Sequence, residues 1–160
     1  HWVAKTNQDA ESVRDFFELR RNGKYGYGSA HYIVGLEGEI VQCIPRAEIA
    51  YHVGSAEYTD YAKLKFSDWA VSNIGSPNYF TIGIEMCHVS DEGFHTEETL
   101  KSAVNLAAWL CDEYGLEAQD ITTHHNIVGW KSCPKWMVDY PEDFQLFQER
   151  VRKRLVKSYG

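Results

Sequence analysis

Long apolar runs and clusters of basic residues are both missing from this 160-residue sequence. No window approaches the ~18 consecutive apolar residues that a membrane-spanning helix needs. The first nine residues also lack the basic and apolar regions of a signal peptide. Lys and Arg total 16 against 23 Asp and Glu, a formal net charge of -7. This balance disfavours a nucleic-acid partner or a membrane partner bound through a basic face.

Cysteine is scarce as well, with four residues spread along the chain at Cys43, Cys87, Cys111 and Cys133. A chain of this length buries about two thirds of its unfolded surface, so it does not need disulfides to stabilise a small core. Two of the cysteines also lie in apolar runs. We therefore expect free thiols rather than a disulfide framework.

Internal repeats and low-complexity linkers are absent too. Hydrophobic residues make up 44% of the chain and charged residues 24%, which is ordinary globular usage. The length and the alternating periodicities predict one α/β domain over residues 1–160, with a mixed central β-sheet flanked by helices. No exposed apolar stripe stands apart from the expected core, so the sequence predicts no particular oligomeric state.

Apolar spacing and end signals place the individual elements. Helices are predicted over 10–21, 96–114 and 141–155, and strands over 30–34, 39–44, 79–87 and 120–123. The first two strands form a hairpin around a turn at 35–38. About two dozen residues before Pro77 show no clean period, which predicts a binding loop. Its aromatic residues either stack on a sugar or peptide or pack on the body of the domain: Tyr58, Tyr61 and Trp69.

Two adjacent histidines, His124 and His125, follow the last predicted strand, and Cys133 comes shortly after them. Two His and one Cys are an accepted ligand set for catalytic zinc, which needs three protein ligands. The third ligand has to come from elsewhere in the chain. A capped loop with an inert buried thiol is the plainer alternative.

A carboxylate interrupts the apolar strand at Glu85, between Ile84 and Met86. Such a group is almost never buried without a partner. One interpretation is a salt-bridged or edge-facing strand residue. The other is a general base beside a metal ion, where the cation stabilises the negative charge.

Five landmarks, taken in order, carry a resemblance to a known family. They are His1 ahead of a short small or polar stretch, SAHYIVG at 29–35, AYHVG at 50–54, NYFTIGIEM at 78–86, and a segment 124–134 that begins HHN and ends KSCP. By their order and spacing the chain resembles the type 2 N-acetylmuramoyl-L-alanine amidases. These are zinc-dependent peptidoglycan hydrolases that share their fold with the peptidoglycan-recognition proteins, and the resemblance extends to about Leu155.

The resemblance implies a zinc enzyme that hydrolyses the amide between N-acetylmuramic acid and L-alanine in bacterial peptidoglycan. The family's metal ligands fall on His1, His124 and Cys133. Its general base falls on Glu85, and the lysine that polarises the substrate carbonyl falls on Lys131.

The resemblance also points to a substrate cleft and to a site of action. Two candidate substrate-binding residues lie in the matching segments, His52 and Asn78, although His52 equally fits a hydrogen-bonded structural histidine. His88 and His95 flank a polar turn, so we expect them at the surface. The implied partner is peptidoglycan, and the protein would act at the bacterial cell wall, secreted or released at lysis.

The sequence departs from the family pattern at two places. The usual spacing to the Cys is one residue shorter, so His125 fits the spacing while His124 fits the motif; we prefer His124 and place the extra residue at Trp130. The strand that precedes the first ligand is also absent, so either upstream residues are missing or His1 lacks that support.

Two alternative functions share this fold or this site. One is a peptidoglycan-recognition module that binds without cutting, and the other is a zinc hydrolase for an unrelated amide. Non-catalytic members of the family typically lack the cysteine ligand. The presence of Cys133, Glu85 and Lys131 therefore favours an enzyme.

Overall fold

Three short strands form the centre of the fold, in the order β2-β1-β3. They are β1 (Tyr32–Val34), β2 (Ile40–Gln42) and β3 (Ile84–Met86). Strands β1 and β2 are antiparallel, with Ile33 opposite Val41, whereas β1 and β3 are parallel, with Ile33 opposite Glu85. The structure, a computed structural model, describes residues 1–3 and 5–158, and side chains as far as residue 156.

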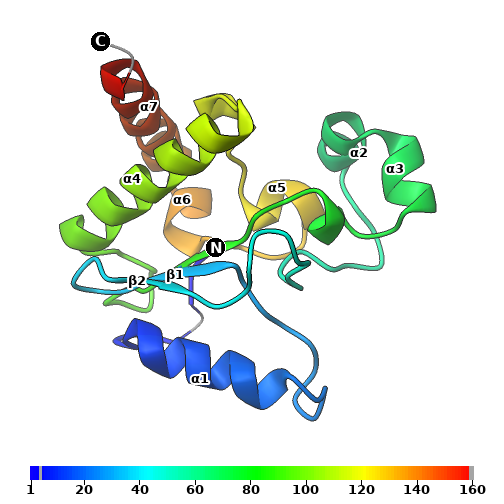
Figure 1. The fold of residues 1–160 in the computed structure, drawn as a ribbon, viewed down its shortest axis with the longest axis horizontal. Helices are drawn as coiled ribbons and strands as arrows, with labels where there is room; N and C mark the ends of the chain where they lie inside the picture. Colours follow the sequence, from blue (N-terminus) through cyan, green and yellow to red (C-terminus); the bar gives the residue numbers. More distant parts are fainter. Residues whose placement is uncertain (4, 159–160) are drawn as a thin grey trace.

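Helices flank this sheet on both faces (Figure 1). In chain order they are α1 (Ala10–Arg20), α2 (Asp60–Phe66), α3 (Asp68–Asn73), α4 (Glu97–Tyr114), α5 (His124–Val128), α6 (Lys135–Asp139) and α7 (Pro141–Ser158), with 3-10 turns η1 (Pro77–Tyr79) and η2 (Ala118–Asp120). The predicted α/β architecture with a mixed sheet is confirmed.

The two faces of the sheet bury side chains in alternation, as strand geometry requires. On one face, Tyr32, Val34 and Met86 pack into a core with α4 and α7. On the other face, Ile33 and Cys87 pack against α1. Strand β1 is therefore buried on both sides, and its parallel neighbour β3 lies in an almost uninterrupted apolar run, as is usual for strands between two packed layers.

Strong local end signals made the long helices predictable. Thr96 caps α4 by accepting a hydrogen bond from the Thr99 backbone nitrogen, and Gly115 ends it in the left-handed conformation. Asp9 caps α1 through the Ser12 nitrogen. Each such cap stabilises a helix by about 1 kcal/mol.

Three predicted elements differ from the structure. The strand predicted over 79–87 is limited to β3 at Ile84–Met86, and Tyr79 ends η1. Residues 120–123 are not a strand: η2 ends at Asp120, and α5 begins at His124 because Thr123 caps it through the Asn126 nitrogen. The predicted loop before Pro77 contains α2 and α3, which begin after the capping residues Thr59 and Ser67. These helices are too short to give a clear 3.6-residue period.

The three aromatic residues of that segment differ in their burial. Tyr58 packs in a small core with Val53 and Ile127, and its hydroxyl accepts a hydrogen bond from the Ser55 nitrogen. Trp69 is 65% exposed and Tyr61 is 39% exposed. A contact with sugar or peptide therefore stays a prediction for these two alone.

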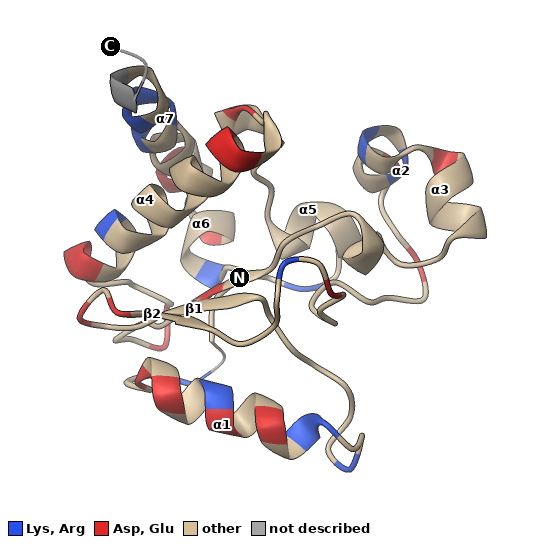
Figure 2. Cartoon of the chain, in the orientation of Figure 1, with Lys and Arg blue, Asp and Glu red and all other residues tan. Residues whose placement is uncertain are grey.

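Charges of both signs intermingle on the outer helices, most visibly on α1 (Figure 2). This arrangement leaves no single-signed basic face on that helix. Among the described residues, no helix combines the length and apolarity required to cross a bilayer. All four cysteines are free thiols, as predicted.

The expectation that His88 and His95 lie at the surface is wrong. They are 1% and 7% exposed, beneath the rings of Trp2 and Trp136. His95 Nδ1 donates to the Cys87 oxygen at 2.8 Å, while His95 Nε2 is buried without a hydrogen-bond partner among the described residues. The covering tryptophans are far away in the sequence, so the local polar turn misled the prediction.

Burial lowers the pKa of His95 to about 4, which predicts a loss of stability in acid. The unfolded chain binds this proton below about pH 6.5 and the folded protein only below about pH 4, so the free energy of unfolding decreases as the pH falls through that interval. Between pH 7.5 and pH 5 the expected loss is roughly 2 kcal/mol. His95→Asn, which retains a donor for the Cys87 carbonyl, should reduce the pH dependence of urea unfolding by that amount.

Every other ionisable side chain is present in both proteins, so the difference between the two pH profiles isolates His95. Parallel profiles for the wild type and His95→Asn would contradict the lowered pKa. The urea midpoints of both proteins at pH 7.5 provide the reference for any direct effect of the substitution.

Candidate metal centre

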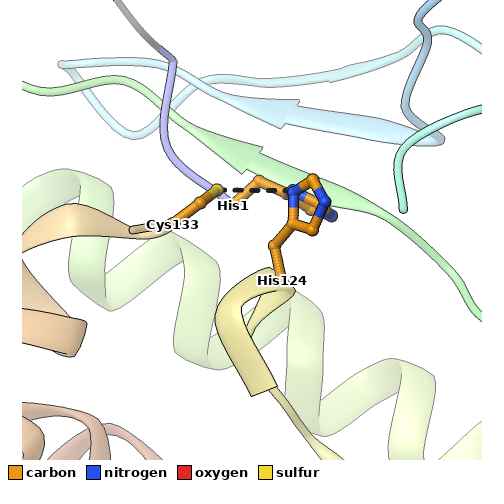
Figure 3. Close-up of side chains that lie close together, drawn as sticks. All are labelled: His1, His124 and Cys133. Carbon is orange, nitrogen blue, oxygen red and sulfur yellow. Dashed lines mark hydrogen bonds between the residues drawn. The ribbon is translucent and has the colours of Figure 1, made fainter. Parts of the chain in front are cut away.

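Three side chains from distant parts of the chain meet beside the sheet: His1, His124 and Cys133 (Figure 3). Their possible ligand atoms all lie within 4.8 Å of one another. His1 Nδ1 is 3.5 Å from Cys133 Sγ, and the His1 and His124 ring centroids are 4.7 Å apart. The structure thus brings together the three residues predicted as ligands.

Each of these residues is held by a separate element. Backbone hydrogen bonds of 3.1 Å, from the Met86 nitrogen to His1 and from Val3 to the Met86 oxygen, pair residues 1–3 with β3. His124 opens α5, and the loop after α5 folds back so that the His125 nitrogen donates to the Cys133 oxygen at 3.0 Å. His1 therefore has strand support from β3 itself.

The start of α5 determines which of the two adjacent histidines, His124 or His125, faces the cluster. His124 is buried and faces His1, whereas His125 Nδ1 donates to the Lys131 oxygen at 3.1 Å. Only His124 reaches the cluster, because successive residues of a helix are turned by about 100° around its axis and the two side chains point in different directions.

His124 is an anomaly as a buried polar group. Both of its ring nitrogens, and Glu85 Oε2 nearby, are buried without a hydrogen-bond partner among the described residues. Buried polar atoms are normally satisfied, and an orphan indicates an ion or water that belongs there. Burial also lowers the pKa of His124 to about 3, so its ring is neutral, the state that binds a metal. The donor set and its burial fit zinc.

Opposing effects act on the other titratable groups of the cluster. Burial lowers the pKa of His1, but the Cys133 contact and the Glu85 carboxylate raise it, and the net shift is upward. Burial raises the pKa of Glu85, while His1 and Lys131 lower it, and the net shift is again upward. Glu85 Oε1 lies 4.0 Å from His1 Nδ1, with only 13% of the side chain exposed. A cation is the component that would stabilise this buried carboxylate.

The two predicted substrate-binding residues contact the protein itself. His52 Nδ1 is 2.8 Å from His1 Nε2, and Asn78 Oδ1 accepts hydrogen bonds from the backbone nitrogens of His52 and Val53. Burial lowers the pKa of His52 well below its usual value, and the nearby His1 and His31 add to this shift. Contact of His52 or Asn78 with substrate stays a prediction.

A cavity of about 710 Å³ borders the cluster on the side of His1, His52 and His124. Its lining includes Phe66 and Phe80, whose rings stack with centroids 6.2 Å apart. A volume of this size is in the range of sites that take small ligands. The cluster is therefore accessible from a hollow with an aromatic wall.

Comparison with known proteins decides the family. Residues 1–136 match the family described as N-acetylmuramoyl-L-alanine amidase. The chain belongs to the N-acetylmuramoyl-L-alanine amidase family. It is 32% identical over 151 residues to a probable N-acetylmuramoyl-L-alanine amidase of Bacillus licheniformis, an alignment that covers 94% of this chain and 39% of the relative.

Other relatives agree with this assignment. The chain is 28% identical to the N-acetylmuramoyl-L-alanine amidase BlyA of Bacillus subtilis (strain 168), over 97% of this chain and 40% of the relative. It thus spans about two fifths of the length of these curated amidases. Among solved structures, PlyL matches with a TM-score of 0.67 at 19% identity, covering 95% of this chain and 80% of that chain. The catalytic domain of XlyA matches with a TM-score of 0.64 at 22% identity, over 92% and 82%.

Two residues of this amidase-family chain were missed by sequence reasoning. Thr81 Oγ1 lies 3.0 Å from His52 Nε2. Gly83 makes room for the same ring, since a Cβ at Gly83 would lie 2.6 Å from His52 Cγ. The glycine within a β-rich run was the one available signal, because such a glycine often marks a close approach of another group.

Proposed function

We propose that this chain is a zinc-dependent amidase that hydrolyses the bond between N-acetylmuramic acid and L-alanine in bacterial peptidoglycan. The observation that carries the proposal is the cluster of His1, His124 and Cys133 next to a buried Glu85, in a chain of this family. His1 and His124 would hold the metal through imidazole nitrogens, and Cys133 through its sulfur. A zinc ion in such a site acts as a Lewis acid that polarises a carbonyl and lowers the pKa of water to about 7.

Glu85 is the group that would move the proton. Its carboxylate lies beside the cluster, 4.0 Å from His1 Nδ1, and a positioned carboxylate can act as a general base and then as a general acid once it has taken a proton. We therefore assign to Glu85 the removal of a proton from the attacking water and its return to the amine of the departing L-alanine.

Lys131 would supply positive charge to the substrate. The loop residue lies close enough to lower the pKa of both Glu85 and His124 by its charge. The carbonyl oxygen of the substrate becomes negative in the tetrahedral intermediate, and a cation near that oxygen stabilises it more than it stabilises the ground state. The Lys131 side chain is exposed, so a large substrate such as peptidoglycan can contact it.

Action at the bacterial cell wall follows from this substrate, with secretion or release at lysis as the route to it. The test is incubation of the protein with purified peptidoglycan, with and without a chelator, followed by identification of new amino termini and new reducing ends. New L-alanine termini that vanish with chelator and return with zinc are the expected result. Reducing ends or other termini would place the cut at another bond.

Binding to the wall without any new termini would contradict catalysis and favour the recognition module. Hydrolysis that persists after complete removal of the metal would contradict the role of zinc. A chelator-treated sample supplemented with magnesium serves as the control for a non-specific effect of metal removal.

A further inference from the structure

A chain of hydrogen bonds leads from the metal cluster into the protein through His52. His1 Nε2 is 2.8 Å from His52 Nδ1, and His52 Nε2 is 3.0 Å from Thr81 Oγ1. The Thr81 hydroxyl is in turn 2.9 Å from the Pro77 carbonyl oxygen. The hydrogen bonds therefore run from the His1 ring to the His52 ring and from the His52 ring to Thr81.

The chemistry of the last member sets the direction of every bond. A carbonyl oxygen can only accept, so the single hydroxyl proton of Thr81 is donated to Pro77. Thr81 Oγ1 must then accept from His52, which places the proton of the neutral His52 ring on Nε2. His52 Nδ1 is left with its lone pair, and it accepts the Nε2 proton of His1.

The consequence for His1 is that its other nitrogen, Nδ1, carries a free lone pair. Nδ1 is the atom that faces the cluster, 3.5 Å from Cys133 Sγ and 4.0 Å from Glu85 Oε1. A histidine binds a metal through a ring nitrogen that has a free lone pair. The hydrogen-bond partner of the other ring nitrogen, here Nε2, normally determines which tautomer is present.

The surroundings hold His52 in this orientation. Asn78 Oδ1 anchors its backbone nitrogen at 3.0 Å, and the absence of a side chain at Gly83 admits the ring. The ring of His31 lies next to that of His52, and its Nδ1 is also an acceptor, since it accepts a hydrogen bond from the Gly83 nitrogen at 3.0 Å. Rotation of the His52 ring would break both of its hydrogen bonds in a buried place.

We propose that Thr81 and His52 are positioning residues that fix the tautomer of His1 and so present its Nδ1 to the metal. This inference rests on the proposed zinc site. Neither residue is required to touch the substrate for this role. The use of a neutral histidine, oriented by a threonine, takes the place that a carboxylate or backbone carbonyl commonly has beside a metal-bound histidine.

The test compares Thr81→Val, which removes the acceptor at nearly constant volume, with Thr81→Ser, which retains it. Zinc affinity is measured by competition with a chromophoric chelator. Thr81→Val should bind zinc about 10- to 100-fold more weakly, the usual effect of losing a group that orients a ligand. Thr81→Ser should remain close to the wild type. Equal affinities for the two variants at equal melting temperatures would overturn the proposal.

A second measurement reads the tautomers directly and does not depend on the variants. Long-range proton–nitrogen NMR spectra of the wild type, labelled with ¹⁵N-histidine, should show His52 with its proton on Nε2, with or without zinc. A proton on Nδ1 of His52 would overturn the proposal even if Thr81→Val failed to fold. A wild type that binds no zinc would instead contradict the proposed function, and the His52 tautomer in that protein would still decide the direction of the hydrogen bonds.

Discussion

Glu85→Gln should retain zinc and lose turnover by about 10³-fold, within the range of 10²–10⁴ that general acid–base catalysis contributes. The amide has almost the same size and shape as the carboxylate, but it cannot take a proton at neutral pH. Because Glu85 lies on β3 and not in the ligand set, its replacement leaves His1, His124 and Cys133 in place. Release of L-alanine termini from peptidoglycan measures the turnover, and chelator competition measures the bound zinc.

The matched control is Glu37→Gln, which removes a carboxylate from an exposed turn of the β1–β2 hairpin. This variant should hydrolyse peptidoglycan like the wild type. Near-wild-type hydrolysis by Glu85→Gln would exclude Glu85 as the general base. Joint loss of zinc and activity would instead assign Glu85 to the ligand set.

Stability provides a further distinction between these roles. Burial raises the pKa of Glu85, which means that the ionised carboxylate is disfavoured in the folded protein without metal. Removal of that charge should therefore leave the melting temperature of the metal-free protein unchanged or raise it. An unchanged or raised melting temperature together with a large loss of turnover would show that Glu85 serves catalysis and not the stability of the fold.

The parts of the fold that could be predicted from the sequence are those with local signals. Helix α4 begins after Thr96 and ends before Gly115, where a capping side chain and a left-handed glycine announce its ends. The hairpin of β1 and β2 follows from two β-rich runs separated by the Gly35–Gly38 turn. In both cases the determining interactions lie within a few residues of one another.

The start of α5 could not be predicted in the same way. A β-branched run at 121–123 favours a strand, but Thr123 competes by capping a short helix through Asn126. That outcome depends on the loop that returns to Cys133, whose oxygen accepts from the His125 nitrogen. Propensity is a weak prior, and a tertiary hydrogen bond of this kind overrides it.

Some residues of the metal cluster could be predicted from the sequence, and the hydrogen bonds around it could not. Family resemblance implied the ligand residues, and the structure brings their side chains together. The partners of His52 were not predictable, because His1, His52 and Thr81 are joined only by tertiary contacts across three segments. A hydrogen-bond chain of this type leaves no periodic or spacing signal in a single sequence.

Cys133→Ser should weaken zinc binding by at least about 100-fold and abolish most hydrolysis. Zinc sites with four protein ligands bind with about 10–16 kcal/mol, on average roughly 3 kcal/mol for each ligand, which is about two orders of magnitude in affinity. A serine hydroxyl is not among the usual zinc ligands, in contrast to a thiolate. Cys43→Ser is the matched control, since Cys43 is half-buried on the α1 side of the sheet and should not affect zinc.

Thermal unfolding separates this effect from a loss of catalysis alone. Zinc at about 1,000 times its dissociation constant stabilises the wild type by roughly 4 kcal/mol, which raises the melting temperature by about 10 °C. Glu85→Gln and Cys43→Ser should keep this zinc-dependent shift. At the same zinc concentration, the 100-fold weaker binding of Cys133→Ser leaves at most about 1.4 kcal/mol of stabilisation, roughly a third of the wild-type value, together with the loss of turnover. If Cys133→Ser retained the shift, the sulfur would not be a ligand, and the Glu85 carboxylate, 4.0 Å from His1 Nδ1, would be the nearby oxygen donor able to complete the set.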